Sequence, residues 1–439
     1  MNHSSRIPGF YTRSIDDRRR MMAERSDCDP TEINRALATG GLDPVTADKT
    51  VENVLGTYAL PFSVALNFCI NGRDYLIPMV IEEPSVVAAA SNAARLVREG
   101  GGFVAEADES LMAAQVQLWD VGDIARATER LTAERSALLR AADHAVPGLV
   151  ARGGGARDLR VRDLGDGLLV VHVVIDVCDA MGANLVNTVA EALGPRIAAL
   201  TSGRLGLQIL SNLSDDRCVR VRASVPVTAL SMDGRVGTDV RDGIVAASRF
   251  AERDPYRAAT HNKGVMNGVD GVVMATGNDW RAVEAGAHAF AARDGRYGPL
   301  SSWDVGADGS LVGRLTMPMA LGTVGGTLRT HPTARLALRL LGVSRSRELA
   351  MIAASVGLAS NLGALRALAT EGIQRGHMSL HARSVAQAAG AHGLEVDTIA
   401  AIIADAGNVT LDAARAALAE LRGEASAAVE PSTSPSSCK

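Results

Sequence analysis

The chain of 439 residues has few aromatic residues, few cysteines and no excess of positive charge. Aromatic residues make up 3% of it and its formal net charge is −4, so nothing in its composition indicates a nucleic-acid-binding protein. It contains no run of 18 apolar residues and no apolar core near its start, so we predict no membrane span and no signal peptide. Its five cysteines form no CxxC pattern, which favours a reducing, cytoplasmic compartment without a disulfide framework or a metal site.

Nucleotide-binding signatures are also scarce. The phosphate-binding loop GxxxxGK[ST] is absent, and the one match to GxGxx[GA], at residues 100–105, follows a predicted helix instead of a strand, so we reject it. A better candidate is Asp179-Ala-Met-Gly-Ala-Asn184, because it joins the strongest predicted strand, residues 168–177, to a helix. Free backbone N–H groups at such a helix start can bind a pyrophosphate. The alternative is an ordinary strand–turn–helix joint capped by Asp179.

Lysine is the scarcest charged residue. Only Lys49, Lys263 and Lys439 are lysines among the 45 basic residues; the others are arginines. Lys263 lies in the segment 260–268, Thr-His-Asn-Lys-Gly-Val-Met-Asn-Gly, which we interpret as a turn between two apolar segments. A lysine can donate a proton and change its pKa, which arginine cannot do, so Lys263 is a candidate for catalysis. A chance surface lysine is the alternative.

Two carboxylates follow apolar segments in the same way. Glu83 comes after the apolar segment 75–81, a predicted buried strand, and before a predicted helix over 86–97. Asp279 comes after the apolar residues 271–274, which we interpret as another strand end. A buried acid, a lysine and a second acid are typical of a site that handles protons, although spacing does not establish that they meet. For Glu83 the alternative is an ordinary carboxylate at a helix start.

Two histidines, His377 and His381, lie four residues apart in a segment predicted to be helical, so they would share one helix face. The zinc-binding motif HExxH would require Glu at position 378, where the chain has Met378, so we predict no metal. The alternatives are two polar surface histidines or one histidine that acts as a proton donor at the edge of a site.

These patterns predict an α+β fold built from several segments. Residues 110–220 read as a separate α+β unit inserted between residues 1–109 and residues 221–375. Residues 376–423 are predicted to be helical, and the Ser/Pro/Ala-rich residues 424–439 to be disordered.

Six motifs, taken together and in order, resemble those of the class II (bacterial) 3-hydroxy-3-methylglutaryl-CoA reductases, over residues from about 4 to about 422. The motifs are Glu52-Asn-Val-Leu-Gly56, Glu83-Pro-Ser-Val-Val-Ala-Ala-Ala-Ser91, Asp179-Ala-Met-Gly-Ala-Asn184, Asp254-Pro-Tyr-Arg-Ala-Ala-Thr-His-Asn-Lys-Gly264, Gly277-Asn-Asp-Trp280 and Arg375-Gly-His-Met378. The resemblance implies reduction of the 3-hydroxy-3-methylglutaryl-CoA (HMG-CoA) thioester to mevalonate by two nicotinamide hydrides, with release of CoA, or the reverse oxidation. The physiological direction stays open.

The resemblance also implies catalytic roles. Lys263 would stabilise the oxyanion that develops on the reacting carbonyl, and Asp279 beside it would keep the amine charged. Glu83 would be the acid that shuttles protons, with a pKa raised by burial. His377 would protonate the departing CoA thiolate.

The other implied site residues bind substrate and cofactor. Those matching substrate-binding positions are Ser85, Arg257, Asn267, Asn361 and His381. Those matching the nicotinamide dinucleotide site are Asp179, Met181, Gly182, Asn184 and Asn212. Asp143 could accept a hydrogen bond from the adenosine ribose and repel a 2′-phosphate, so we expect NAD, with NADP possible.

The resemblance further implies an architecture. Residues 110–220 would be a small ferredoxin-like, non-Rossmann domain that binds the dinucleotide, and the rest of 1–375 would be a large substrate-binding domain. Residues 376–423 would form a mobile flap that brings His377 to the substrates. Two chains would share active sites in a dimer or an assembly of dimers. Two alternatives are an oxidoreductase for another acyl or hydroxy-acid substrate and a non-catalytic protein that keeps the fold.

Overall fold

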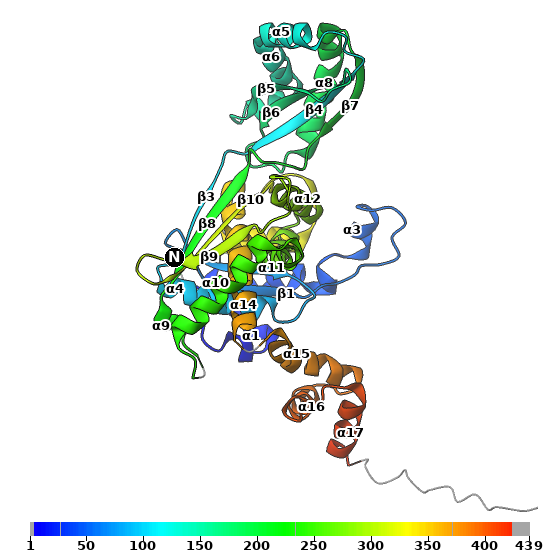
Figure 1. The fold of residues 1–439 in the computed structure, drawn as a ribbon. Coiled ribbons are helices and arrows are strands. Elements are labelled where there is room, and N and C mark those ends of the chain that lie inside the picture. Colours follow the sequence, from blue (N-terminus) through cyan, green and yellow to red (C-terminus); the bar gives the residue numbers. More distant parts are fainter. Residues whose placement is uncertain (1–3, 27, 233, 371, 424–439) are drawn as a thin grey trace, which may run out of the picture. The chain divides into compact units, whose positions relative to one another are not determined.

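The computed structural model describes residues 4–26, 28–232, 234–370 and 372–423, and within them leaves the side chains of residues 39, 327 and 373–380 undescribed. The chain divides into two compact units. The main unit comprises Met1–Glu82 and Val86–Arg366, and the C-terminal unit comprises Glu83–Ser85 and Ala367–Lys439. Figure 1 shows the order of the elements along the chain.

The main unit contains a six-stranded sheet with the strand order β2-β1-β3-β8-β10-β9. Its strands are β1 (Phe62–Ile70), β2 (Arg73–Val80), β3 (Phe103–Ala107), β8 (Cys218–Val225), β9 (Ser301–Val305) and β10 (Leu311–Pro318). Neighbours are antiparallel except β1 and β3, which run parallel where Ile70 meets Phe103. Strand β2 is buried along most of its length because helices α11 (Pro255–Ala275) and α13 (Pro332–Leu341) pack on it.

A second, four-stranded sheet has the order β5-β6-β4-β7, with all neighbours antiparallel. Its strands are β4 (Leu111–Trp119), β5 (Gly155–Asp163), β6 (Leu169–Asp176) and β7 (Arg204–Leu210). The helices between them are α5 (Ile124–Ala133), α6 (Arg135–Ala145), α7 (Pro147–Val150) and α8 (Ala183–Thr201). This β-α-β-β-α-β order is the ferredoxin-like arrangement. The predicted α+β fold class with its ferredoxin-like part is therefore confirmed.

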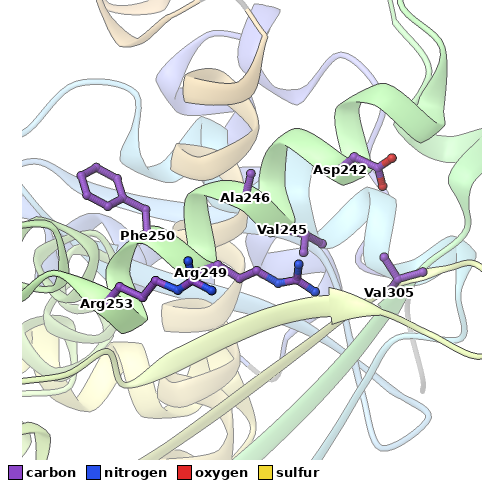
Figure 2. Close-up of a pocket in the computed structure, with 7 residues that line it drawn as sticks. All are labelled: Asp242, Val245, Ala246, Arg249, Phe250, Arg253 and Val305. Atoms are coloured by element: carbon purple, nitrogen blue, oxygen red, sulfur yellow. The ribbon is translucent and has the colours of Figure 1, made fainter.

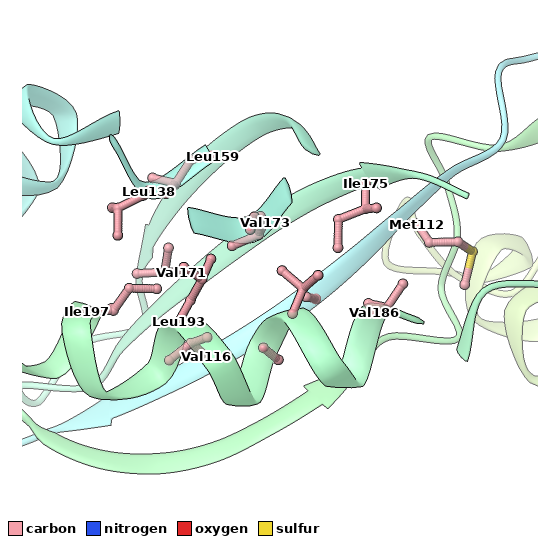
Figure 3. Close-up of a cluster of buried hydrophobic side chains, with 14 of the residues drawn as sticks. Met112, Val116, Leu138, Leu159, Val171, Val173, Ile175, Val186, Leu193 and Ile197 are labelled. Atoms are coloured by element: carbon pink, nitrogen blue, oxygen red, sulfur yellow. The ribbon is translucent and has the colours of Figure 1, made fainter. Parts of the chain in front are cut away.

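The core of this part lies between the four-stranded sheet and its helices. Figure 3 shows Val171, Val173 and Ile175 of β6 facing Val186 and Leu193 of α8. On the way from β4 to β5, α5 ends at Ala133 and α6 starts anew at Arg135.

The remaining helices of the main unit surround the six-stranded sheet and the N-terminal segment. They are η1 (Phe10–Thr12), α1 (Ile15–Arg25), α2 (Pro30–Ala36), η2 (Ala38–Gly41), α3 (Pro44–Asp48), α4 (Val86–Glu99), α9 (Val227–Leu230), α10 (Gly237–Arg253), α11 (Pro255–Ala275), α12 (Trp280–Ala291), η3 (Gly326–Arg329), α13 (Pro332–Leu341) and α14 (Ser346–Ala369). Side-chain caps start several of them: Ser14 caps α1, Asp29 caps α2 and Asp254 caps α11.

Helices α11 and α14 approach each other through glycines. A Cβ on Gly268 of α11 would lie 2.5 Å from the carbonyl oxygen of Val356, and a Cβ on Gly357 of α14 would lie 2.7 Å from the side chain of Val269. Gly271 makes a similar approach to β2, where a Cβ would meet the side chain of Met79 at 2.7 Å. Gly268 therefore lets α11 lie against the backbone of α14 at a separation that no larger residue permits, whereas Gly271 meets only the flexible end of the Met79 side chain.

Two sequence predictions are wrong at α11. The segment 260–268 is helix, not a turn, and the apolar residues 271–274 are the last turn of the same helix, not a strand. Of the two glycines in that segment, Gly268 serves helix packing, because a Cβ there would meet the carbonyl oxygen of Val356. Lys263 and Asp279 therefore lie on and after one long helix.

Helix α14 is long and apolar enough to cross a membrane by length and composition alone. In the structure 78% of its apolar window is buried, so it is a core helix of the main unit.

The C-terminal unit contains α15 (Ile373–Ala388), α16 (Leu394–Asp405) and α17 (Leu411–Leu421). Alanines dominate its buried core, whose members are Ala382, Ala386, Ala391, Ile399, Ala400, Ile403, Ala414, Ala417 and Leu418. The predicted helical character of residues 376–422 is confirmed, whereas the predicted mobility of this segment stays a prediction. The tail 424–439 lies outside the described residues.

The glycine packing makes a testable prediction. Gly268→Ala should lower the free energy of unfolding by about 1–3 kcal/mol, because the new methyl group meets a backbone carbonyl that cannot move aside. On the same helix, Gly264→Ala is the control: its nearest neighbour is Ala364 Cβ at 3.9 Å, so it should gain about 0.5–1 kcal/mol from helix propensity. Urea unfolding of both variants measures the difference, and equal effects would contradict the packing argument.

Candidate functional site

A cleft of about 1270 Å³ lies in the main unit, where three turns converge. Its lining includes the turn 179–184 between β6 and α8, the turn 277–279 between α11 and α12, and the loop 322–326 after β10. The structure thus brings Asp279 together with four predicted dinucleotide-binding residues, Asp179, Met181, Gly182 and Asn184.

Asp179 caps a different helix from the one the sequence suggested. Its Oδ1 accepts a hydrogen bond from the N–H of Ser346 at 2.9 Å, at the start of α14, and Arg345 lies 3.6 Å from its Oδ2. Gly182 is the N-cap of α8 with φ of 112°, and no side chain caps that helix. The first N–H groups of α8 therefore remain available to an anion in the cleft.

Asn278 and Gly322 hold two of the converging turns together. The Asn278 side chain accepts from the N–H of Gly322 at 2.7 Å and donates to its carbonyl at 3.1 Å. A Cβ on Gly322 would lie 2.5 Å from the backbone nitrogen of Met181, so only glycine fits between the turns. The N–H of Thr323 also donates to the carbonyl of Asp179 at 2.9 Å. Asp279 is therefore fixed relative to the turn 179–184.

Arg217 is a site residue that the sequence did not reveal. Its guanidinium is almost fully buried and donates to the carbonyls of Met181 at 3.0 Å and Leu321 at 2.6 Å, and to that of Ala180 at 3.3 Å. Burial lowers the pKa of Arg217 to about 10, and the nearby acids Asp176 and Asp179 oppose that shift. The sequence does not distinguish Arg217 from the other arginines, because arginine is the usual basic residue of this chain.

Several arginines line the same cleft, namely Arg152, Arg329, Arg345 and Arg347. Guanidinium groups and an uncapped helix start suit the phosphates of a dinucleotide or of coenzyme A. Glu348, which also lines the cleft, is engaged by protein groups. Its Oε1 forms an ion pair with the guanidinium of Arg73 at 2.8 Å and accepts a hydrogen bond from the hydroxyl of Tyr75 at 2.7 Å. Burial first, and then the hydrogen bond with Glu348 and its charge, raise the pKa of Tyr75.

Two predicted cofactor residues lie apart from the lining of this cleft. A Cβ on Gly286 of α12 would lie 2.6 Å from the carbonyl oxygen of Asn212, so Asn212 packs against that helix. Asp143, in α6, accepts a hydrogen bond from the N–H of Ala156 at 2.8 Å through Oδ1. Contacts of both residues with a dinucleotide stay predictions.

Three predicted site residues lie on α11. Lys263 is exposed, whereas Arg257 and Asn267 are half-buried. Lys263 and Asn267 are four residues apart and so share one helix face. Burial lowers the pKa of Arg257, and none of the ion pairs found among the described residues includes its guanidinium. A charged fork of this kind suits a carboxylate ligand.

Lys263 and Asp279 do not meet within one chain. The N–H of Asn278 donates to the carbonyl of Val273 at 3.0 Å, which places the turn 277–279 at the end of α11. Val273 lies ten residues after Lys263, about 15 Å along a helix that rises 1.5 Å per residue. That separation exceeds the combined reach of the two side chains.

The C-terminal unit carries the other predicted catalytic residues. Glu83 and Ser85 belong to it, and Ser85 has a left-handed φ of 76° with its hydroxyl buried and without a hydrogen-bond partner. His377 and His381 lie four residues apart on α15, and His381 is exposed. The side chain of His377 lies outside the described residues.

Asn361 is a core residue of α14. It is 1% exposed, and its Oδ1 accepts from Trp303 Nε1 at 2.8 Å and from the hydroxyl of Ser301 at 3.1 Å. The same hydroxyl bonds His261 Nε2 at 2.8 Å, and burial lowers the pKa of His261 to about 4. Asn361 therefore positions α11 through these groups, and its contact with substrate stays a prediction.

A second hollow, of about 510 Å³, runs along α10. Figure 2 shows its lining, which includes Arg249, Phe250 and Arg253 of α10 and Val305 of β9, and none of the predicted site residues. In the part of the chain that the structure describes, no group of three or more His, Cys, Asp or Glu side chains could hold a metal ion.

Comparison with known proteins identifies the family of this site. The family model for hydroxymethylglutaryl-coenzyme A reductase matches residues 14–382. A curated 3-hydroxy-3-methylglutaryl-coenzyme A reductase of Archaeoglobus fulgidus is 47% identical over 422 residues, 95% of each chain. A probable enzyme of the same name from Borreliella burgdorferi is 34% identical over 76% of this chain and 77% of its own.

Solved structures agree. A 3-hydroxy-3-methylglutaryl-coenzyme A reductase from Streptococcus pneumoniae superimposes with a TM-score of 0.80 at 42% identity, covering 94% of this chain and 99% of its own. A class II structure from the same organism, bound to NADPH in open conformations, gives a TM-score of 0.79 at 42% identity over 83% of this chain and 99% of its own.

The role of Arg217 can be tested against a neighbour. Arg217→Lys should raise the dissociation constant for NADPH about tenfold, because one amine cannot satisfy the separate carbonyls that the guanidinium bonds. Arg220→Lys is the control, since Arg220 forms an exposed ion pair with Asp108 at 2.7 Å and should change the affinity little. Titration of nicotinamide fluorescence measures both, and similar affinities for the two variants would refute a role for Arg217 in shaping the turn.

Proposed function

Because the chain belongs to the class II hydroxymethylglutaryl-coenzyme A reductase family, we propose that the cleft and the exposed face of α11 form the two halves of one active site. The protein is an oxidoreductase of the HMG-CoA thioester and NAD(P)H. The reaction is the four-electron reduction of the thioester to mevalonate with release of CoA, or its reverse. The observation that carries the proposal is the gathering of Asp279 with the dinucleotide turn in one cleft, away from Lys263.

Lys263 carries the central chemistry in this proposal. Its ammonium stabilises the negative charge that develops on the carbonyl oxygen and supplies a proton to it. Asp279 keeps the amine protonated, and Glu83 moves protons to and from the reacting oxygen. His377 protonates the thiolate of the departing CoA, which prevents the thiolate from adding back.

The substrate-binding roles follow from side-chain chemistry. The half-buried guanidinium of Arg257 binds the terminal carboxylate of the substrate, and Asn267, one turn from Lys263, bonds its hydroxyl. The unsatisfied hydroxyl of Ser85 offers a further hydrogen bond. Asn361 holds α11 in place, and His381 lies on the CoA side.

The dinucleotide supplies the hydride when it is bound. The N–H groups at the start of α8 and the arginines of the cleft hold its phosphates, while Asp179, Met181, Gly182 and Asn184 shape the surrounding turn. Asn212 and Asp143, which lie apart from the cleft lining, contact the dinucleotide beyond the cleft in this proposal. The charge of Asp143 favours NAD over NADP.

The separation of Lys263 from Asp279 supports a site that two chains share. About 15 Å of α11 lies between Lys263 and the turn that carries Asp279, so both reach one substrate only if each comes from a different subunit. We infer a dimer, or an assembly of dimers, in which Lys263 faces Asp279 of the partner subunit. Among the described residues, Cys69, Cys178 and Cys218 form no disulfide bond, which supports a cytoplasmic location.

Mixing two inactive variants tests the function and the shared site together. Lys263→Ala and Asp279→Ala should each abolish NAD(P)H oxidation with HMG-CoA. A mixture unfolded and refolded together should recover about one quarter of wild-type activity, because half the dimers are mixed and each has one intact site. As a control, equal amounts of the two folded variants are mixed without unfolding, so that subunits do not exchange, and this mixture should stay inactive. An inactive wild type would refute the function, and an inactive refolded mixture would refute the shared site.

Coenzyme choice gives a second test. Asp143→Asn keeps an acceptor for the N–H of Ala156 but removes the negative charge, so the ratio of kcat/KM for NADPH to that for NADH should rise about tenfold. Steady-state rates with both coenzymes measure the ratio. An unchanged ratio would show that Asp143 does not select the coenzyme.

A further inference from the structure

His261 is a buried histidine of α11 that lies four residues after Arg257 and two residues before Lys263. It is 1% exposed, and its Nε2 lies 2.8 Å from the hydroxyl of Ser301 and 3.1 Å from the carbonyl oxygen of the same residue. On the other side of the ring, Nδ1 is buried and has no hydrogen-bond partner among the described residues. The proposed function uses Arg257 and Lys263 but gives no role to the histidine between them.

The neighbours of His261 determine which of its ring nitrogens carries the proton. Trp303 Nε1 can only donate, and it donates to Asn361 Oδ1 at 2.8 Å, so that atom is the carbonyl oxygen of the amide. The hydroxyl of Ser301 therefore donates its one hydrogen to the same oxygen, at 3.1 Å. Towards His261 this hydroxyl can then only accept, as can the carbonyl of Ser301, so Nε2 carries the proton.

The other ring nitrogen, Nδ1, is consequently a bare acceptor. Burial first, and then the positive charge of Arg257, lower the pKa of His261 to about 4, so the ring is neutral near neutral pH. A buried acceptor without a donor is destabilising, because it has lost its bond to water and gained none in return. The fold therefore leaves one acceptor on α11 that needs a donor.

Arg257 is a donor within reach of that acceptor. Residues four apart on an α-helix are neighbours, with about 5–6 Å between their Cβ atoms, so Arg257 and His261 share one face of α11. The Arg257 side chain is half-buried, burial alone lowers its pKa, and it has no hydrogen bond or ion pair with another described residue. A guanidinium has five N–H donors, and a carboxylate takes only two of them.

We propose that His261 is a positioning residue for the substrate carboxylate: when Arg257 binds that carboxylate with two N–H groups, another of its N–H groups donates to His261 Nδ1. An arginine side chain has several rotatable bonds, and a fixed acceptor beside it removes the conformations in which its fork faces away from the substrate. Because Ser301 holds the imidazole ring, the acceptor itself has a defined position. The inference rests on the proposed function, in which Arg257 binds the carboxylate, and adds the residue that orients Arg257.

Two variants separate the roles of the two ring nitrogens. His261→Gln places an amide near the position of Nε2, so it keeps the bond to Ser301 and removes the acceptor at Nδ1. We expect it to raise KM for HMG-CoA about tenfold with kcat nearly unchanged, because one charge-assisted hydrogen bond is lost from substrate binding. His261→Asn instead places an amide oxygen near the position of Nδ1 and loses the bond to Ser301. It should unfold at a lower urea concentration and keep KM close to the wild-type value.

A double-mutant cycle with Arg257 tests the connection directly. In an Arg257→Ala background, His261→Gln should raise the dissociation constant for HMG-CoA no further, because the arginine that it orients is absent. Calorimetry without coenzyme measures that constant and requires no turnover. The control is Ser248→Ala, since the buried hydroxyl of Ser248 accepts from the N–H of Trp303 at 2.9 Å. Its loss should lower the free energy of unfolding and leave KM unchanged.

Three outcomes would refute the role of His261. The first is a KM that rises as much in His261→Asn as in His261→Gln, and the second is an equal loss of affinity from His261→Gln with and without Arg257. The third is a similar rise of KM in Ser248→Ala, which would attribute the effect to lost stability. If His261→Asn fails to fold, the double-mutant cycle decides. A wild type that neither binds nor reduces HMG-CoA would instead refute the function on which the inference depends.

Discussion

The close approach of α11 to α14 and β2 is the constraint on which the rest of the site depends. Glycines at the contacts let the helix backbone lie against Val356 on one side and Met79 on the other. Once α11 is fixed in this way, its exposed face presents Lys263 and Asn267, and its end sets the position of the turn before α12. One packing arrangement thus determines both the location of the amine and the distance from it to Asp279.

The predicted catalytic residues lie in three separate parts of one chain: the cleft, the exposed face of α11 and the C-terminal unit. The turn 179–184, where we propose that the dinucleotide binds, shares a cleft with Asp279, and Asn278, Gly322 and Arg217 hold the turns of that cleft together. Lys263 lies about 15 Å away along α11. Rigid positioning of each half suits electrostatic stabilisation, because groups that are fixed in advance need not reorganise as charge develops. The C-terminal unit, which has an alanine-rich core, carries Glu83 and the two histidines His377 and His381.

Much of the fold could be predicted from the sequence, because its strongest signals are local. Apolar strands such as β2 and β6 fall where the pattern predicts, and the motif around Asp179 lies in the cleft. The failures have one physical cause: the partner that gives a residue its role lies far away in the chain. The glycines of α11 suggest a turn unless Val356 and Met79 are known to lie beside them. Asp179 accepts a hydrogen bond from the N–H of Ser346, 167 residues later, at the start of α14. Arg217 looks like any other arginine until its acceptors are seen. The roles of Glu83, Lys263 and His377 came from resemblance, since spacing alone cannot place them together.

The buried guanidinium of Arg217 also limits how the dinucleotide-binding part can be treated as a module. Two of its acceptors, the carbonyls of Ala180 and Met181, belong to the ferredoxin-like part. The other two lie outside it: Leu321 follows β10 of the six-stranded sheet, and Ser346 is the first residue of α14. If residues 111–210 were excised or grafted onto another protein, those carbonyls would lose the cation that orients them. The ferredoxin-like sheet would have its own core, yet its coenzyme turn would be incomplete. Under the proposed function, coenzyme recognition would therefore be a property of the whole main unit and not of a transplantable domain.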